Sequence, residues 1–197
     1  MLVAIDGPDA AGTTTLAREV GACLVRPTVI ASVDGWHNPR EVRLRRGAES
    51  AEGYYLDSFD HEALVRECLG PFGSGAGRVR TASFDYQTDS GVEAQQEVAL
   101  DAVLLFDGVF LLRPELRARW HLRVYLHVPE SVTLARALQR DVQRFGSPDE
   151  VRRRYERRYL PGQALYREEA SPLEYADIVL DNTHPADPVV MRWTDTG

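Results

Sequence analysis

Short apolar runs alternate with longer amphipathic segments along the whole chain. Apolar runs bounded by turn residues predict buried strands. We expect strands at Leu2–Asp6, Thr28–Val33, Val103–Phe106, Leu122–Val128 and Ile178–Leu180, the last of the series. Strands that alternate with helical segments are typical of βαβ units around a mostly parallel sheet, so the pattern predicts an α/β fold.

Two amphipathic segments in the N-terminal half predict helices over Thr14–Leu24 and Ser58–Leu69. The second helix is expected to stop at Gly70-Pro71, because proline lacks the N–H group that would continue it. The Gly-rich segment Gly70–Gly77 that follows is predicted to be a flexible loop.

The C-terminal half predicts two helices that carry many arginines. The first, Glu130–Phe145, should end at Gly146. The second should start at Ser147-Pro148-Asp149-Glu150, which has the S-x-x-E capping-box spacing with proline at the first helical position. Its arginines, Arg152–Arg158, are interpreted as solvent-exposed, because a charge run on a capped helix usually faces water.

Composition limits the class of protein. A length of 197 residues suits one domain, and we expect residues 1–197 to form it. No apolar run approaches the roughly 20 residues of a membrane span, and the start lacks the basic segment of a signal peptide. Two cysteines form neither a disulfide framework nor a metal cluster. We expect a cytoplasmic protein with no membrane partner, and the net charge of −7 argues against a nucleic-acid partner.

The strongest motif directly follows the first predicted strand and opens the first predicted helix. It matches the P-loop pattern G-x-x-x-x-G-K-[ST], in which backbone N–H groups and the positive helix end surround a phosphate. The residues expected to bind a nucleotide are Gly7, Asp9, Ala10, Ala11, Gly12, Thr13, Thr14 and Thr15. The alternative is a glycine turn that only joins the strand to the helix.

One position departs from this pattern, because Thr13 stands where the motif has lysine. All 23 basic residues of the chain are arginine. The backbone donors of the loop remain, so a phosphate can still bind there. The missing ammonium group would have stabilised the β- and γ-phosphates by about 4 kcal/mol at an effective dielectric near 20. An arginine could supply part of that charge.

Further segments accompany the P-loop in a definite order. They are residues 32–37 (SVDGWH), 54–60 (YYLDSFD), 84–90 (FDYQTDS), 105–109 (LFDGV), 140–141 (RD), 159–161 (YLP) and 175–179 (YADIV). In this order and spacing, from Leu2 to about Asn182, the chain resembles the uridine kinase family of P-loop phosphotransferases. That family is itself similar to phosphoribulokinase and the bacterial pantothenate kinases.

The resemblance implies a P-loop NTPase three-layer sandwich. Its parts are about five parallel strands flanked by helices, a β-hairpin over the acceptor site and an Arg-bearing helical lid at approximately residues 136–160. The implied activity is that of a small-molecule kinase, a phosphotransferase with an alcohol acceptor. ATP or another NTP, together with Mg²⁺, would be required, and a nucleoside such as uridine would be the acceptor.

Two acidic residues match functional positions of the family. Asp34 matches the catalytic acid, which takes the proton from the acceptor hydroxyl. Independently, it ends a strand predicted to lie next to the P-loop strand, where ligands bind in open α/β sheets. Asp107 matches the residue that holds Mg²⁺ directly or through water, with Thr14 as its partner in metal binding. Each aspartate could instead cap the turn before the glycine that follows it.

Arg136, Arg140 and Arg144 recur every four residues, so they project from one helix face. Arg140 and Arg144 match lid positions that clamp phosphates, and we assign them catalytic roles. Arg136 is assigned to the substrate. The alternative is a solvated arginine face paired with Asp141 and nearby acids.

The predicted acceptor pocket departs from the family pattern. The residues assigned to it besides Arg136 are Asp57, Phe84, Tyr86 and Asp89. Asp89 stands where the family has a base-recognising histidine, and packing within a hairpin is the alternative for the two aromatic residues.

The leading hypothesis is ATP- and Mg²⁺-dependent phosphorylation of a hydroxyl on a small metabolite. Because of Thr13, the alternative is a nucleotide- or phosphate-binding protein with little or no kinase activity. The expected partner is a small-molecule substrate, and assembly into a homo-oligomer is left open.

Overall fold

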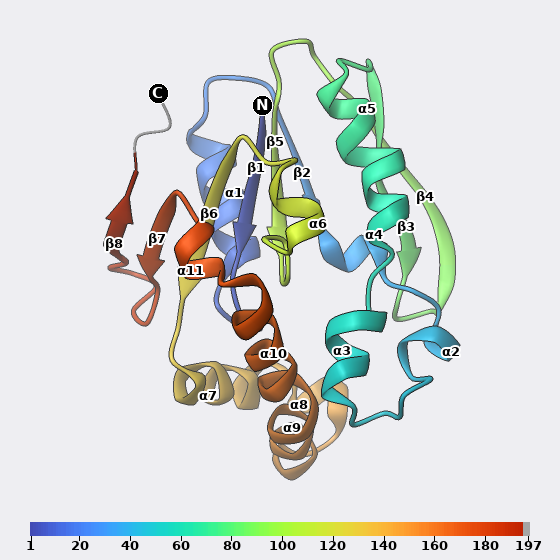
Figure 1. The fold of residues 1–197 in the computed structure, drawn as a ribbon, viewed down its shortest axis with the longest axis vertical. Coiled ribbons are helices and arrows are strands. Elements are labelled where there is room, and N and C mark those ends of the chain that lie inside the picture. The colour runs from blue at the N-terminus through green and yellow to red at the C-terminus, as the bar shows by residue number, and fades with distance from the viewer. Residues whose placement is uncertain (195–197) are drawn as a thin grey trace.

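The computed structural model describes residues 1–194 and has a central six-stranded sheet with helices on both faces (Figure 1). In spatial order the strands are β2 (Thr28–Ser32), β5 (Val103–Gly108), β1 (Leu2–Asp6), β6 (Leu122–His127), β7 (Ile178–Asp181) and β8 (Val189–Trp193). The first five are parallel, and β8 is antiparallel to β7. The predicted α/β sandwich is confirmed.

Apolar clusters cover both faces of this sheet. Val3 and Ile5 of β1 pack with Ala17 of α1 (Thr13–Cys23), whereas Ala4 faces the larger cluster on the other side. Neighbouring residues of a strand point to opposite faces, so a strand buried on both sides reads as a continuous apolar run. This is why the run Leu2–Asp6 predicts β1 with its observed bounds.

The remaining elements surround the sheet (Figure 1). In chain order they are the short helix η1 (Val33–Trp36), α2 (Arg40–Arg43), α3 (Ala51–Asp57), α4 (His61–Leu64), the π-helical turn η2 (Val65–Leu69), α5 (Gly70–Gly73), strands β3 (Arg78–Asp85) and β4 (Ser90–Glu97), α6 (Pro114–Arg117), α7 (Glu130–Arg140), α8 (Val142–Phe145), α9 (Pro148–Arg154), the π-helical turn η3 (Tyr155–Tyr159), α10 (Leu160–Ala170) and α11 (Pro172–Tyr175). Strands β3 and β4 form a separate antiparallel hairpin.

The helix predicted to stop at Gly70-Pro71 continues to Gly73, so the predicted stop was wrong. The predicted flexible loop Gly70–Gly77 was wrong for residues 70–73, which are helical. The Gly70 N–H donates to the Val65 carbonyl, which makes the preceding turn π-helical. A π-helical turn contains one residue more than an α-helical turn, and here it comes directly before a proline, which has no backbone N–H to donate. The same arrangement recurs at η3, where the Leu160 N–H donates to the Tyr155 carbonyl just before Pro161.

Two expectations about the sheet were also wrong. Ile178–Leu180 is followed by a further strand, β8, at the sheet edge. Because Val189, Val190 and Met191 are all more than half exposed, β8 has no alternating pattern that would reveal it. In addition, β5 lies between β1 and β2, so the strand before Asp34 is not adjacent to the P-loop strand.

The predicted helix Glu130–Phe145 is divided at Asp141, which separates α7 from α8. Ala137, Val151 and Tyr155 form the centre of a small apolar cluster that joins α7 to α9 and is distinct from the clusters of the sheet. We call residues 130–159 the arginine arm; it includes most of the predicted lid, residues 136–160, and lies beyond the lower end of the sheet in Figure 1.

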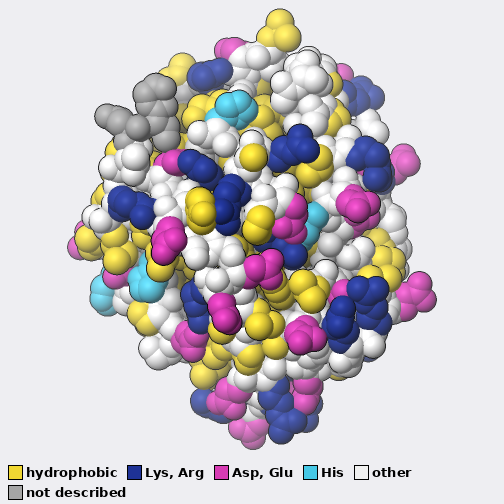
Figure 2. Space-filling view, in the orientation of Figure 1, with side chains coloured by type: hydrophobic (Ala, Val, Ile, Leu, Met, Phe, Trp, Pro, Cys, Tyr) yellow, Lys and Arg dark blue, Asp and Glu magenta, His cyan; other side chains and the backbone are white. Residues whose placement is uncertain are grey.

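The surface in Figure 2 carries arginine and acidic side chains interspersed over the face seen in Figure 1. This distribution accords with the modest acidic net charge of the chain. Within residues 1–194, every helix is too short or too polar to cross a membrane.

Candidate functional site

A cavity of about 1080 Å³ lies at the carboxyl ends of the parallel strands. Its walls come from the β1–α1 loop, the ends of β2 and β5, the α2–α3 region, the β3–β4 hairpin and the arginine arm. In open α/β sheets this edge is where ligands bind. The cavity is large enough for two small molecules side by side, since drug-sized ligands occupy sites of about 300–1,000 Å³.

The loop between β1 and α1 has the backbone geometry of a phosphate cradle. Ala10 and Gly12 both have positive φ, at 57° and 98°. A Cβ atom at Gly7 would lie 3.0 Å from the Leu126 carbonyl oxygen, and one at Gly12 would lie 2.9 Å from Asn182 Nδ2. Both motif glycines are therefore required by the fold, and α1 begins at Thr13 with its free N–H groups at this loop.

Not all of the predicted loop residues reach the cavity. Asp9, Ala10, Thr13 and Thr14 line it, together with Pro8. The other predicted residues do not: Gly7, Ala11 and Gly12 shape the loop from behind, and Thr15 is exposed outside the cavity.

Arg136 supports the loop from behind, away from the cavity. Its guanidinium donates to the Ala10 carbonyl at 3.1 Å, to the Asn182 carbonyl at 2.7 Å and to the Thr183 carbonyl at 3.1 Å. Asn182 Nδ2 in turn donates to the Ala11 carbonyl at 2.7 Å. The predicted substrate role of Arg136 does not agree with this position, because its donors are already used by backbone oxygens.

A second support joins the loop to α10. Asp6 is fully buried at the end of β1, where it accepts hydrogen bonds from the Gly7 N–H at 2.8 Å and the Leu112 N–H at 3.3 Å. The Tyr166 hydroxyl also donates to Asp6. Burial raises the pKa of the Asp6 carboxyl to about 7, although these hydrogen bonds oppose the shift.

We expect Asp6→Asn to remove a pH-dependent part of the unfolding free energy. A carboxyl with a raised pKa in the folded state binds its proton more tightly there, so its contribution to stability falls as the pH rises from about 4 towards 7. Between pH 5 and 7, the stability of the wild type relative to Asp6→Asn should fall by about 2 kcal/mol. Urea unfolding of both proteins at the two pH values measures this change.

The control for this measurement is Asp187→Asn, because Asp187 is exposed. Its difference from the wild type measures what the loss of one exposed carboxylate contributes under the same conditions. An Asp6→Asn difference that is independent of pH would show that Asp6 does not titrate as described.

Thr14 and Asp107 meet on the floor of the cavity. The Thr14 hydroxyl donates to Asp107 Oδ2 at 2.6 Å, and Ser32 Oγ donates to the same oxygen at 3.4 Å. Burial raises the pKa of Asp107, and the Thr14 hydrogen bond opposes that shift. Hydroxyl and carboxylate oxygens are the ligands that Mg²⁺ prefers. Residues 1–194 contain no group of three or more acidic, histidine or cysteine side chains placed for a metal, but Mg²⁺ bound with phosphates commonly uses only one or two carboxylates.

Asp34 lies in η1, directly after β2, and faces the same cavity. Its backbone N–H donates to Ser32 Oγ at 3.4 Å, which caps η1. Asp34 is exposed to the open cavity. The cavity walls raise the pKa of its carboxyl by desolvation, while the positive charges of Arg144 and Arg140 lower it. His37 lies beside Asp34, with Nδ1 at 2.9 Å from the Asp34 carbonyl oxygen.

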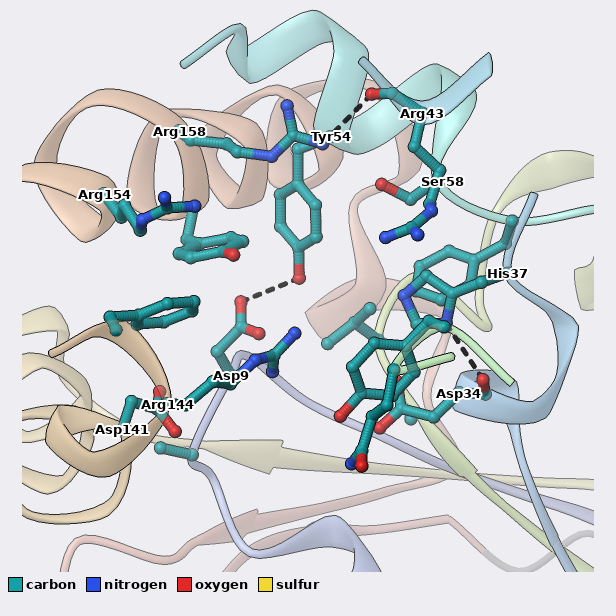
Figure 3. A pocket seen from close by; sticks show the side chains of 18 of the residues that line it. Asp9, Asp34, His37, Arg43, Tyr54, Ser58, Asp141, Arg144, Arg154 and Arg158 are labelled. Atoms are coloured by element: carbon teal, nitrogen blue, oxygen red, sulfur yellow. Dashed lines mark hydrogen bonds between the residues drawn. The ribbon is translucent and has the colours of Figure 1, made fainter. Parts of the chain in front are cut away.

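Two of the predicted lid arginines, Arg140 and Arg144, line the cavity, and they have different partners. Arg140 forms an ion pair with Asp141 at 2.7 Å, as the alternative interpretation had it. Arg144 lies over the Tyr86 ring, with its guanidinium carbon 4.7 Å from the ring centroid. Figure 3 labels Arg144 among the side chains that line this cavity.

The interpretation of Arg152–Arg158 as simply exposed was wrong for two members. Arg154 and Arg158 line the cavity, and Arg158 is only 5% exposed. The π-helical turn η3 contains Arg158, and such turns are frequent at functional sites. The sequence offered one signal, a proline two residues after Tyr159, but nothing that distinguished Arg158 from its neighbours.

The predicted acceptor residues are only partly brought together. Tyr86 and Asp89 line the cavity, whereas Phe84 and Asp57 do not. Asp57 is buried and binds Arg46 Nε at 2.8 Å and also Arg45, so both of its oxygens are already used. A substrate role for Asp57 therefore disagrees with its position.

Tyr54 is a cavity residue that the sequence did not assign. Its hydroxyl donates to Asp9 Oδ2 at 2.8 Å, and Gln163 Nε2 approaches the same oxygen at 3.4 Å (Figure 3). Burial raises the pKa of the Asp9 carboxyl, and these two hydrogen bonds oppose the shift. Asp9 thereby links the P-loop to α3 and α10.

The architecture and the cavity together define a P-loop kinase fold. A glycine-shaped loop follows the central strand β1, Asp107 ends the neighbouring strand β5, and Asp34 follows β2, the strand beyond it. The chain belongs to the Phosphoribulokinase / Uridine kinase family, whose sequence profile matches residues 2–183. The members of this family are small-molecule kinases.

Solved structures agree on the fold. A possible uridine kinase from Bacillus stearothermophilus has a TM-score of 0.72 and 23% identity over 91% of this chain and 87% of that chain. A candidate fructose transport system kinase from Silicibacter has a TM-score of 0.66 and 24% identity over 89% and 85%. A D-glycerate 3-kinase from Cryptococcus neoformans has a TM-score of 0.63 and 12% identity over 97% and 89%. The names of these three proteins do not point to one common acceptor molecule.

Proposed function

We propose that this chain transfers the γ-phosphoryl group of ATP to a hydroxyl group of a small metabolite. The observation that carries the proposal is that the P-loop, the Thr14–Asp107 pair and Asp34 all face one cavity. Two carboxylates beside a phosphate loop provide separate groups for holding a metal and for accepting a proton.

In this reaction the acceptor oxygen forms a bond to the γ-phosphorus while the bond from that phosphorus to the β–γ bridging oxygen breaks, and ADP leaves. The hydroxyl proton passes to the Asp34 carboxylate. Backbone N–H groups at the start of α1 hold the phosphates. Mg²⁺, held by Thr14 and Asp107 directly or through water, would neutralise charge on the phosphate oxygens.

Closure of the arginine arm over the cavity is part of this proposal. The arm has an apolar cluster of its own, centred on Ala137, Val151 and Tyr155, which holds its helices together. Because Arg136 and Arg158 bind backbone carbonyls outside the arm, the closure we propose is a small movement of the segment between them. Closure would bring Arg140 and Arg144 onto the transferring phosphoryl group and exclude water, which limits wasteful hydrolysis.

A nucleoside such as uridine is the acceptor that the sequence resemblance suggested. Of the two aromatic residues assigned to a base, only Tyr86 lines the cavity, where its ring packs with His37, the two ring centroids being 4.7 Å apart. Phe84 lies outside the cavity, and Asp89 is paired with Arg43 at 2.9 Å. With only one of the predicted base contacts available, we propose a hydroxyl metabolite without restricting it to a nucleoside.

Thr13 favours a second candidate function, nucleotide binding with little or no turnover. Calorimetry with ATP and Mg²⁺, followed by ADP release in the presence of nucleosides, pantothenate, hydroxy acids and sugar phosphates, separates the two. We expect ATP binding and acceptor-dependent ADP release. Tight ATP binding with no phosphorylated product from any acceptor would establish the binding protein instead.

A further inference from the structure

Arg43 and Arg158 form the wall of the cavity beside α2 and α3, and we call them the arginine pair. The Arg158 guanidinium donates to the carbonyls of Arg43 at 3.3 Å and of Ser50 at 3.1 Å, so the two residues are held together. Arg43 is largely buried, with its side chain 15% exposed, and its Nε is fully buried with no hydrogen-bond partner among the described residues.

The positive charge of this wall is poorly neutralised. The hydrogen bonds of Arg158 all go to uncharged backbone carbonyls, and within residues 1–194 it forms no ion pair with a carboxylate. Asp89 pairs with Arg43 but is itself 40% exposed, so water screens that partner. By contrast, Arg140 and Arg154 have close acidic partners at 2.7 Å and 2.6 Å.

The fields of these guanidinium groups converge on the acceptor side of the cavity. Burial, together with the charges of Arg43, Arg144 and Arg158, lowers the pKa of His37 to about 4, although its hydrogen bond to the Asp34 carbonyl opposes the shift. His37 contacts the Asp34 backbone, and Arg144, one of the three arginines that act on His37, also acts on the Asp34 carboxyl. Desolvation also lowers the pKa of Arg158, with Arg43 and Arg154 adding repulsion. Clustered like charges of this kind attract an anion.

The arginine pair is separated from the P-loop by Tyr54. Its hydroxyl end binds Asp9 of the loop, while the Arg158 guanidinium lies 5.6 Å from its ring centroid (Figure 3). The nucleotide phosphates belong at the loop, on the Asp9 side. An anion at the arginine pair would therefore be part of the other substrate.

We propose that the acceptor is an anionic hydroxyl compound whose phosphate or carboxylate group binds the arginine pair while its hydroxyl group lies at Asp34. This inference rests on the proposed kinase function and narrows its substrate class. Guanidinium groups bind both oxyanions through charge-assisted hydrogen bonds, and Arg43 lines the cavity with Asp89 as its one carboxylate partner among the described residues. The uncharged nucleosides of the sequence-based hypothesis lack such a group.

The test uses matched compounds that differ in the anion: ribose 5-phosphate with ribose, and D-glycerate with glycerol, with uridine as a neutral nucleoside. Thermal unfolding midpoints with each compound report binding without turnover, and ADP release with ATP and Mg²⁺ reports phosphorylation. We expect at least one anionic member to raise the midpoint more than its neutral partner. Comparison of ribose 5-phosphate with D-glycerate shows whether a phosphate or a carboxylate is preferred.

The variant that carries the test is Arg43→Gln, because Arg158 also anchors residues 43–50 and its loss could unfold the chain. Removal of one charge-assisted contact should weaken binding of the anionic compound by about 10- to 100-fold with no change in KM for ATP. Arg43→Lys should recover part of the loss. Arg152→Gln, at an exposed position of α9 outside the cavity, is the matched control.

The outcomes separate this inference from the proposed function. Turnover of uridine, ribose or glycerol in preference to every anionic compound would overturn the inference and leave the kinase proposal standing. Anion binding that depends on Arg43, without ADP release, would support the inference and count against the kinase. Binding of no anion, or a rise in KM for ATP alone in Arg43→Gln, would also overturn the inference, because the arginine pair would then serve no acceptor.

Discussion

Replacement of Asp34 by Asn is expected to lower kcat by about 100- to 10,000-fold, the contribution of a positioned general base. Asn keeps the size of the side chain but cannot accept the hydroxyl proton. Because the proposed metal ligands are Thr14 and Asp107 and the phosphates are held by the P-loop, the affinity for ATP should change less than kcat. Initial rates and calorimetric titration with ATP measure the two quantities separately.

The pH dependence gives a second readout of the same variant. Desolvation raises the pKa of Asp34, and only its ionised form can accept a proton. The wild-type rate should therefore rise with pH until it passes that raised pKa and then level off. In Asp34→Asn this rise should disappear. A variant with wild-type kcat and an unchanged pH profile would remove Asp34 from the chemical step.

Thr13→Lys is expected to raise kcat/KM for ATP, by up to about 1,000-fold. One ammonium–phosphate contact is worth about 4 kcal/mol at an effective dielectric near 20, which corresponds to three powers of ten in rate. Of the predicted lid arginines, Arg136 is used by backbone carbonyls and Arg140 by Asp141. Steady-state rates at varied ATP measure the gain, and Thr13→Gln, which is long but uncharged, is the control.

A cycle with Arg144→Gln shows whether Arg144 replaces the lysine. If it does, Thr13→Lys should restore much of the activity that Arg144→Gln loses, and the two effects will not add. If Thr13→Lys gives no more than Thr13→Gln, the loop already receives its positive charge from another group, and the missing lysine does not limit the rate.

The sequence predicted the parts of the site that depend on local order. The P-loop follows from glycine spacing between a strand and a helix, and Asp34 and Asp107 follow from their positions at strand ends. Such features are recognised because backbone geometry restricts the residues that can form them. Their roles in catalysis are still predictions.

Contacts between distant segments were not accessible in the same way. Arg158 and Arg152 look alike in the sequence, yet one is buried in the cavity wall and the other is exposed. The difference arises from the carbonyls of residues 47–50, more than 100 positions away, which Arg158 meets only in the folded chain. Likewise, Asp57 is held outside the cavity by its ion pairs with Arg45 and Arg46. The helix also continues through Pro71 by means of a π-helical turn, which a proline in the sequence does not predict.

During synthesis the P-loop leaves the ribosome well before the side chains that hold it in place, because those side chains lie more than 150 positions further along the sequence. Tyr166 donates to Asp6 at the base of the loop, and Asn182 donates to Ala11 within it. A nascent chain in which these residues are still inside the ribosome has the glycine motif without the hydrogen bonds that hold it. Competence to bind nucleotide should therefore appear late in translation, after β7 has joined the sheet, and a partly synthesised chain would not sequester ATP.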